Sequence, residues 1–146
     1  MSSKLKKIFR FWAPPIIWGI LIYSGSSEQS ISLSAVYWQD LVIHKLAHII
    51  EYSILGILIY RALIHEKMSR RTAVMYAIII SLLYGISDEF HQKFPLVAPI
   101  VSIMTSLRRG LLVDTIGATS GILIVWKLLP KMPKKLLNLA EKLDLL

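Results

Sequence analysis

The chain contains no cysteine and few acidic residues. Its 146 residues include nine aspartates and glutamates against 17 lysines and arginines, which gives a formal net charge of +8. The absence of cysteine excludes disulfide bonds, thiolate metal sites and a cysteine nucleophile. In a soluble protein the basic excess would favour nucleic-acid binding, but here the basic residues flank apolar segments. Topology signals and contacts with anionic lipid headgroups explain that pattern better, so we expect no nucleic-acid partner.

Apolar residues dominate the composition. They make up 55% of the chain, compared with about 45–50% in ordinary soluble domains. Four stretches approach the roughly 20 apolar residues that a spanning helix needs. A soluble helical bundle would require a polar stripe on each helix, yet residues 77–83 are apolar all round. We therefore predict a single all-α integral membrane domain with four transmembrane helices, at about residues 8–24, 46–63, 72–90 and 111–129.

The N-terminal segment allows two interpretations. Basic residues precede an apolar run that ends in small residues, as in a signal peptide. However, the run contains Trp12 and Trp18, which are typical of a retained span anchored at the membrane interface. We favour a retained span, with Pro14 and Pro15 in its first turns, where proline is tolerated or kinks the helix.

The distribution of basic residues predicts the orientation. Thirteen of the 17 lysines and arginines lie near the N-terminus, between spans two and three, or after span four. The exceptions are Lys45, Lys93, Arg108 and Arg109. Because positive charge marks the cytoplasmic side, both termini should be cytoplasmic. His65, near the predicted cytoplasmic loop, is interpreted as a surface histidine.

Two further segments complete the predicted architecture. Residues 93–106 are apolar, are interrupted by two prolines and are too short to span, so we expect a re-entrant or interfacial loop between helices three and four. Residues 131–146 place Leu136, Leu139, Ala140 and Leu143 on one helical face. This pattern predicts a C-terminal amphipathic helix on the inner leaflet, with a frayed, solvated tail as the alternative.

Two polar runs inside apolar stretches mark the candidate site. They are residues 44–52, in span two, and residues 87–92, at the end of span three. Each ionisable side chain at a helix centre in the membrane costs about 2.5–3.5 kcal/mol on insertion scales, so such residues pair, face water or function. On helices, His44, His48 and Glu51 share one face, and Asp88 shares a face with His91.

Several roles remain open for these residues. The first is a metal site, although the full His-Glu-x-x-His and Glu-x-x-His motifs are absent. The second is acid–base catalysis, with His48, Glu51, Asp88, Glu89 and His91 as candidates, although neighbouring residues on a helix point about 100° apart and cannot form a dyad. The third is anion recognition by Lys45, Arg108 and Arg109. The fourth is purely structural pairing of charges within the bundle.

Small residues in the last span predict close helix packing. Gly117 and Gly121 form a Gly-x-x-x-Gly motif, which Gly110 extends. Such a motif lets two helix backbones approach closely, either within one chain or between the partners of a homo-oligomer.

The polar runs, taken together with the glycine motif, resemble the VanZ-like family. The marks of this resemblance extend over nearly the whole chain. In this chain the loop after Gln92 is several residues longer than in the family, and Gly110 stands where the family has an aspartate. The matching residues are Ser26, Ser27, Lys45, His48, Glu51, Tyr52, Gly56, the run Asp88-Glu89-Phe90-His91-Gln92, and Asp114, Thr115, Gly117, Ala118 and Gly121.

The resemblance implies a bacterial plasma-membrane protein with four helices, related to an accessory protein of glycopeptide (teicoplanin) resistance. Together with the charge pattern, it leads us to expect binding of an anionic envelope lipid, a lipid-linked precursor or a lipoglycopeptide, without a metal or cofactor. The alternative is an intramembrane hydrolase or transferase. The expected ligand-binding residues are Lys45, His48, Glu51, Tyr52, Asp88, Glu89, His91, Gln92, Arg108, Arg109 and Asp114.

Overall fold

The computed structural model describes residues 3–26, 37–93 and 100–145, and this part of the chain is all-helical. The side chains of a few residues at the helix ends, including Gln92 and residues 100–107, lie outside the description. The elements are α1 (Ser3–Ser26), α2 (Tyr37–His65), α3 (Arg70–Lys93), α4 (Ile100–Leu123), a π-helical segment (Ile124–Leu128), a 3-10 turn (Leu129–Lys131) and α5 (Lys134–Lys142).

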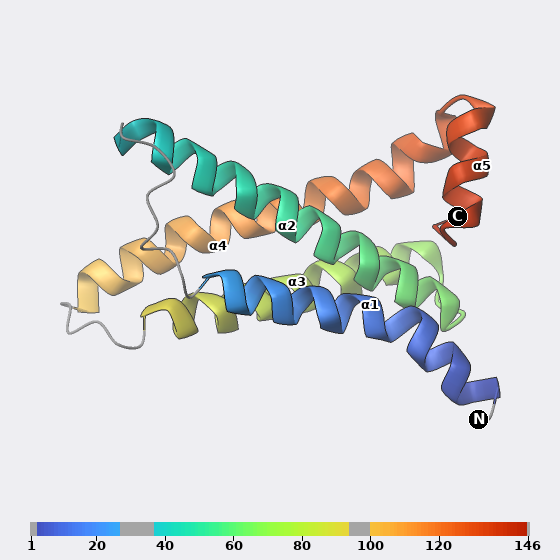
Figure 1. Ribbon diagram of the computed structural model, residues 1–146, viewed down its shortest axis with the longest axis horizontal. Coiled ribbons are helices and arrows are strands. Elements are labelled where there is room, and N and C mark those ends of the chain that lie inside the picture. Colours follow the sequence, from blue (N-terminus) through green and yellow to red (C-terminus); the bar gives the residue numbers. More distant parts are fainter. Residues whose placement is uncertain (1–2, 27–36, 94–99, 146) are drawn as a thin grey trace.

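The four long helices form one bundle, in which α2 and α4 make the most extensive contact (Figure 1). Helix α3 packs on both α4 and α2, and α1 packs mainly on α2. Both chain termini lie at the same end of the bundle (Figure 1). We call this the terminal end. The opposite end, which carries the last turns of α1 and α3, is called the polar end.

Glycines allow α2 and α4 to approach closely. A Cβ on Gly117 would lie 2.6 Å from the carbonyl oxygen of Ile49, and a Cβ on Gly121 would lie 2.6 Å from that of Ser53. The hydroxyl of Ser53 also donates across this contact to the carbonyl oxygen of Gly117, at 2.8 Å. Because α2 covers this glycine face, the face is not available to a second copy of the chain.

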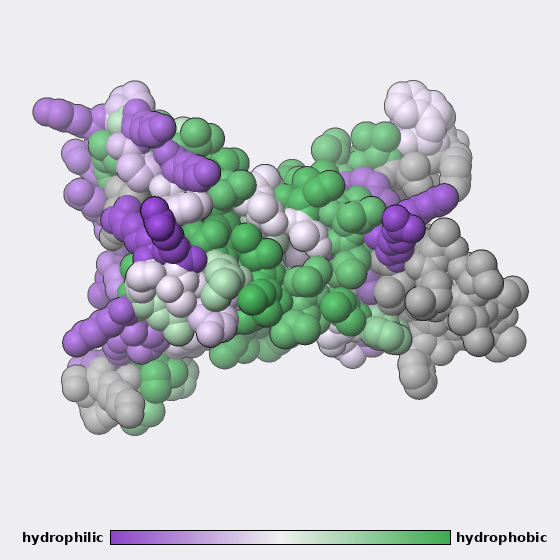
Figure 2. Space-filling view, turned by 180° about the vertical axis from the view of Figure 1, so that it is seen from behind, coloured by the Kyte–Doolittle hydropathy of each residue, from purple (hydrophilic) through white to green (hydrophobic). Residues whose placement is uncertain are grey.

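Within the described residues, three helical segments are long and apolar enough to cross a membrane. They are Val42–His65, Arg70–His91 and Arg108–Lys131. Helix α1 is not among them, so the predicted four-span topology is supported for three spans and remains a prediction for the first. Exposed apolar side chains cover the middle of the bundle, and hydrophilic ones gather toward its ends (Figure 2). This distribution is typical of association with a membrane.

The helices extend beyond the predicted spans because hydropathy counts only their apolar parts. Helix α2 begins at Tyr37, where the predicted span began at residue 46, and α4 begins at Ile100, where the predicted span began at residue 111. Of the predicted loop over residues 93–106, residue 93 and residues 100–106 are helical, and the re-entrant or interfacial placement of the segment stays a prediction. Residues 94–99 of that re-entrant or interfacial segment lie outside the described residues.

The two prolines of α1 lie well inside the helix. The prediction that Pro14 and Pro15 occupy the first turns is wrong, because α1 already begins at Ser3. Proline has no N–H to donate to the preceding turn and its ring crowds that turn, so it bends a helix. The ribbon of α1 changes direction along its length (Figure 1).

The C-terminal segment forms a helix that docks on the bundle. Ala140 is buried, whereas Leu136 and Leu139 are exposed. Helix α5 ends in a Schellman motif, in which Asp144 has a positive φ of 54° and Leu145 N–H bonds to the carbonyl oxygen of Ala140 at 2.9 Å. The predicted amphipathic helix is thus present at Lys134–Lys142, and the alternative of a frayed tail is wrong for these residues.

Asp144 fastens this segment to the terminal end. Its Oδ2 accepts hydrogen bonds from Nη2 of Arg10, at 2.6 Å, and from Nη2 of Arg61, at 3.1 Å. The ring of His65 stacks on Phe11 with centroids 3.8 Å apart, and its Nε2 lies 3.2 Å from the carbonyl oxygen of Asp144. The interpretation of His65 as a plain surface histidine is therefore wrong, because the tail folds back onto it.

We expect Gly117→Ala to lower the free energy of unfolding by about 1–3 kcal/mol, as overpacking does. The added methyl would meet the backbone of Ile49, which cannot rotate away as a side chain would. Thermal unfolding in detergent measures the effect. Gly25→Ala is the matched control, because a Cβ there meets nothing within 4 Å. Equal stability of the two variants would contradict close α2–α4 packing.

Candidate functional site

The first element of the candidate site is the fully buried carboxylate of Asp88 on α3. Ser26 Oγ, at the end of α1, donates to Oδ1 of Asp88 at 2.7 Å. The hydroxyl of Tyr52, on α2, donates to Oδ2 at 3.2 Å. A buried carboxylate is costly unless donors surround it, so these bonds join three helices through one side chain.

The second element is a histidine–carboxylate pair between α2 and α4. Nδ1 of His48 is hydrogen-bonded to Oδ1 of Asp114 at 3.1 Å, and Asp114 is only 2% exposed. The ring of Tyr52 lies nearly parallel to that of His48, with centroids 6.2 Å apart. Gly85 of α3 lies next to both Tyr52 and Asp114. A Cβ on Gly85 would lie 3.4 Å from Tyr52 Cε1 and 3.5 Å from Asp114 Oδ2. Tyr52 is thus close to both buried aspartates.

Glu89 is also buried but points elsewhere. A Cβ on Gly110 of α4 would overlap its carboxylate, so Glu89 lies against that helix. Asp88 instead meets donors from α1 and α2. The two neighbouring acids therefore do not form a dyad, as the geometry of a helix requires. The space beside Gly110 holds a carboxylate, whereas the glycine motif predicted a neighbouring helix there.

A small polar cavity of about 100 Å³ opens between α1 and α2 beside these groups. Two of its lining residues, Ser26 and His48, are the partners of Asp88 and Asp114. A third, Glu51, accepts a hydrogen bond at its carbonyl oxygen from Nε1 of Trp18, at 2.9 Å. The cavity is lined by Gly25, Ser26, His44, Ala47, His48 and Glu51. We call it the polar cavity.

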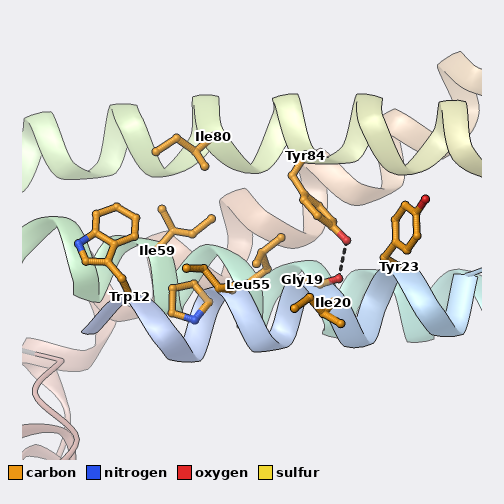
Figure 3. Close-up of a pocket in the computed structure, with 10 residues that line it drawn as sticks. Trp12, Gly19, Ile20, Tyr23, Leu55, Ile59, Ile80 and Tyr84 are labelled. Carbon is orange, nitrogen blue, oxygen red and sulfur yellow. Dashed lines mark hydrogen bonds between the residues drawn. The ribbon is translucent and has the colours of Figure 1, made fainter. Parts of the chain in front are cut away.

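A larger apolar groove of about 390 Å³ runs along α1 (Figure 3). Figure 3 shows Leu55 and Ile59 of α2 lining the groove together with residues of α1 and α3. Toward the polar end Tyr23 and Tyr84 line it, and the Tyr84 hydroxyl donates to the carbonyl oxygen of Gly19 at 2.6 Å. Tyr23 lies less than one helical turn from Gly25 and Ser26 of the polar cavity.

Some predicted site residues lie apart from the cavity. The hydroxyl of Tyr23 and Nδ1 of His91 are 2.8 Å apart, and their rings stack at a centroid distance of 3.8 Å. Arg108 and Arg109 are exposed and form no ion pair with an acid in the described part of the chain. Asp88 and Asp114 are hydrogen-bonded inside the bundle, to Ser26 and Tyr52 and to His48 respectively. Lys45 is half-buried on α2, and the side chain of Gln92 lies outside the description.

Sequence reasoning from charge missed several members of the site. Ser26 was marked only by the resemblance to the VanZ-like family, and Gly85 and Tyr84 carry no charge to single them out. Trp18 was interpreted as an interface anchor, but its indole N–H binds the backbone of α2. Neutral hydrogen-bond partners of buried acids are difficult to find from hydropathy, because they occur commonly in spans.

The described residues support acid–base chemistry better than a metal site. His44, His48 and Glu51 line one cavity, as their spacing predicted. Even so, no group of three or more potential ligands among the described residues has a geometry that could hold a metal ion. A histidine whose Nδ1 is held by a carboxylate, in contrast, has the arrangement of an oriented general base.

Comparisons of the chain with protein-family models, with curated proteins and with solved structures find no match.

We expect Ser26→Ala and Tyr52→Phe each to lower the free energy of unfolding by about 1–3 kcal/mol, because each removes a donor from the buried Asp88 carboxylate. The double variant should depart from additivity, since both act on one group. Unfolding in detergent measures both effects. The control is Ser87→Ala, an exposed neighbour of Asp88 that should change stability by less than about 0.5 kcal/mol. A Ser26→Ala effect no larger than the control would refute the role of Ser26.

Proposed function

We propose that this chain is a VanZ-like bacterial plasma-membrane protein that binds an anionic envelope lipid or a lipid-linked precursor at the polar end of its bundle. One observation carries the proposal. The apolar groove and the polar cavity both border the last turns of α1, where Tyr23 lines the former and Gly25 and Ser26 line the latter. A lipid has the same two parts, an apolar chain joined to a polar headgroup.

The groove suits a hydrocarbon chain. Its walls include Trp12, Ile16, Ile20 and Ile59, and its volume of about 390 Å³ is in the range of ligand sites. It borders the exposed apolar surface of α1, where Ile16 and Ile20 are themselves exposed. A chain could therefore enter sideways from the bilayer without crossing a polar barrier.

The charge distribution favours a headgroup that contacts both the acidic interior of the polar end and the cationic side chains nearer its surface. The interior of the polar end is acidic, because Asp88, Glu89 and Asp114 are all buried. The nearby cations are half-buried Lys45 and, farther along the chain, exposed Arg108 and Arg109. The proposed ligand places its phosphate on the arginines and its hydroxyl or amine donors at Glu51 and His48. Sugar and amine groups in lipid-linked precursors supply such donors.

The family assignment is part of the same proposal. Its support is that residues marked by the resemblance meet in space, since Ser26 and Tyr52 bind Asp88 and His48 binds Asp114. An effect on teicoplanin-type glycopeptides follows from this proposal if the site alters the access of a lipid-tailed drug to the outer leaflet.

An intramembrane hydrolase or transferase is the second candidate. The hydrogen bond between His48 and Asp114 favours it, because this bond orients an imidazole that also lines the polar cavity. In this reading His48 acts as a general base on a group held in the cavity, and Glu51 is the second acid–base residue.

The proposed orientation has four spans and both termini in the cytoplasm. Its support is the shared position of the termini (Figure 1) and the basic residues gathered at that end. In intact cells, single cysteines at Ser27 and Thr105 should react with an impermeant thiol reagent, and one at Ser69 should not. The chain has no native cysteine to give background. Labelling of Ser69→Cys from outside would show that the proposed orientation is wrong and that the opposite one holds.

We expect native mass spectrometry of the purified protein to show a retained anionic lipid that Arg109→Ala and Glu51→Gln each lose. Each variant should weaken binding of added polyprenyl phosphate about tenfold, as loss of one charged hydrogen bond does. Phosphatidylcholine should bind weakly to all forms.

Charge-matched controls are available at the terminal end. Arg71→Ala and Glu141→Gln remove the same charges from exposed positions and should bind lipid like the wild type. If these controls lose the lipid equally, the proposed headgroup site is wrong. If the lipid is chemically converted, and the conversion stops in Glu51→Gln while binding remains, the enzyme candidate replaces simple binding.

A further inference from the structure

A second cavity lies at the terminal end, far along the bundle from the polar cavity. It measures about 370 Å³ and lies between the first half of α1, the second half of α2 and the residues at and just after the end of α5. Three cationic side chains line it, against one carboxylate. The lining residues are Arg10, Ile57, Leu58, Arg61, Lys142, Leu143, Asp144 and Leu145. We call it the terminal cavity.

The two arginines of this cavity already hold an oxyanion. Nη2 of Arg10 and Nη2 of Arg61 converge on one oxygen of Asp144, at 2.6 and 3.1 Å. These arginines, Arg10 first, hold the pKa of the Asp144 carboxyl below its usual range. Phe11 supports both guanidinium groups, which lie 5.4 and 5.0 Å from its ring centroid. The site is therefore preorganised for negatively charged oxygen.

Asp144 does not accept a hydrogen bond from every donor that lines the terminal cavity. Nε of Arg61 is buried and has no hydrogen-bond partner among the described residues. Lys142 lines the same cavity and forms no ion pair in the described part of the chain. A buried donor without an acceptor is unfavourable, so a second anion at this place would satisfy it.

The rest of the lining indicates which anion fits. Ile57, Leu58, Leu143 and Leu145 make half of the cavity apolar, which a small inorganic anion would not use. Ile57, Leu58 and Arg61 belong to a segment long and apolar enough to cross a membrane, near its end. Leu136, Leu139 and Leu143 are exposed on or beside α5. The cavity thus joins a charged pocket to surfaces suited to acyl chains.

We propose that the terminal cavity binds the phosphodiester headgroup of an anionic phospholipid, with the phosphate on Arg61 and Lys142 and an acyl chain against the apolar residues of α2 and α5. This site lies at the opposite end from the polar cavity and does not rest on the function proposed there. The bound lipid ties the C-terminal helix to the bilayer as well as to the bundle.

The test is a titration of the full-length protein in detergent with dioleoylphosphatidylglycerol, followed by native mass spectrometry. Lys142→Gln should weaken binding of one lipid about fivefold, and Arg61→Gln should weaken it by at least as much, since a basic residue near an anionic lipid contributes about this factor. Lys135→Gln, an exposed change of the same charge on the same helix, should bind within about twofold of the wild type. Lys142→Gln keeps every described ion pair, so it tests the site without loosening α5.

Three results would overturn the inference. The first is equal weakening by Lys135→Gln, which would indicate a general effect of charge. The second is equally tight binding of phosphatidylcholine, or displacement of phosphatidylglycerol by equimolar inorganic phosphate. The third is loss of the same lipid in Arg109→Ala, which would place it at the polar end. Retention of that lipid in Arg109→Ala supports a separate terminal site, whether or not the polar cavity binds lipid.

Discussion

The close approach of α2 and α4 is the contact on which the rest of the structure depends. Gly117 and Gly121 meet the backbone at Ile49 and Ser53, which fixes the register of the two helices. Asp114 lies three residues before Gly117, and His48 lies one residue before Ile49. The same register therefore brings His48 to Asp114. A bulkier residue at either glycine would separate the two backbones and lengthen the hydrogen bond between His48 and Asp114 at the same time.

The main outline of the site was readable from the sequence because charged residues are conspicuous in apolar stretches. His48, Glu51 and Asp88 were selected in this way and Asp114 through the resemblance, and the structure places all four near the polar end. Spacing along a helix gives the face on which a residue lies, but not the helix that this face meets. The sequence therefore could not show that Asp88 binds Ser26 and Tyr52.

The misjudged features share a physical cause. Hydropathy ended the predicted spans where charge began, yet α4 continues to Ile100 and α1 to Ser3, because helical hydrogen bonding does not require apolar side chains. His65 was judged from its place near a loop, and its partner Asp144 lies 79 residues away in the chain. Such a long-range contact leaves no local pattern.

Helix α1 is weakly attached to the bundle, and it contributes both to the apolar groove and to the hydrogen bonds beside the polar cavity. This helix packs less extensively on the bundle than the other long helices do, and its prolines interrupt its own hydrogen bonds. It forms one wall of the apolar groove, and it also supplies Ser26 to Asp88 and the Trp18 indole to α2. Moving α1 outward would widen the groove and stretch both bonds at once. A ligand that widened the groove would therefore also weaken these two hydrogen bonds. By reciprocity, a change that strengthens the bonds would lower the affinity of the groove for such a ligand.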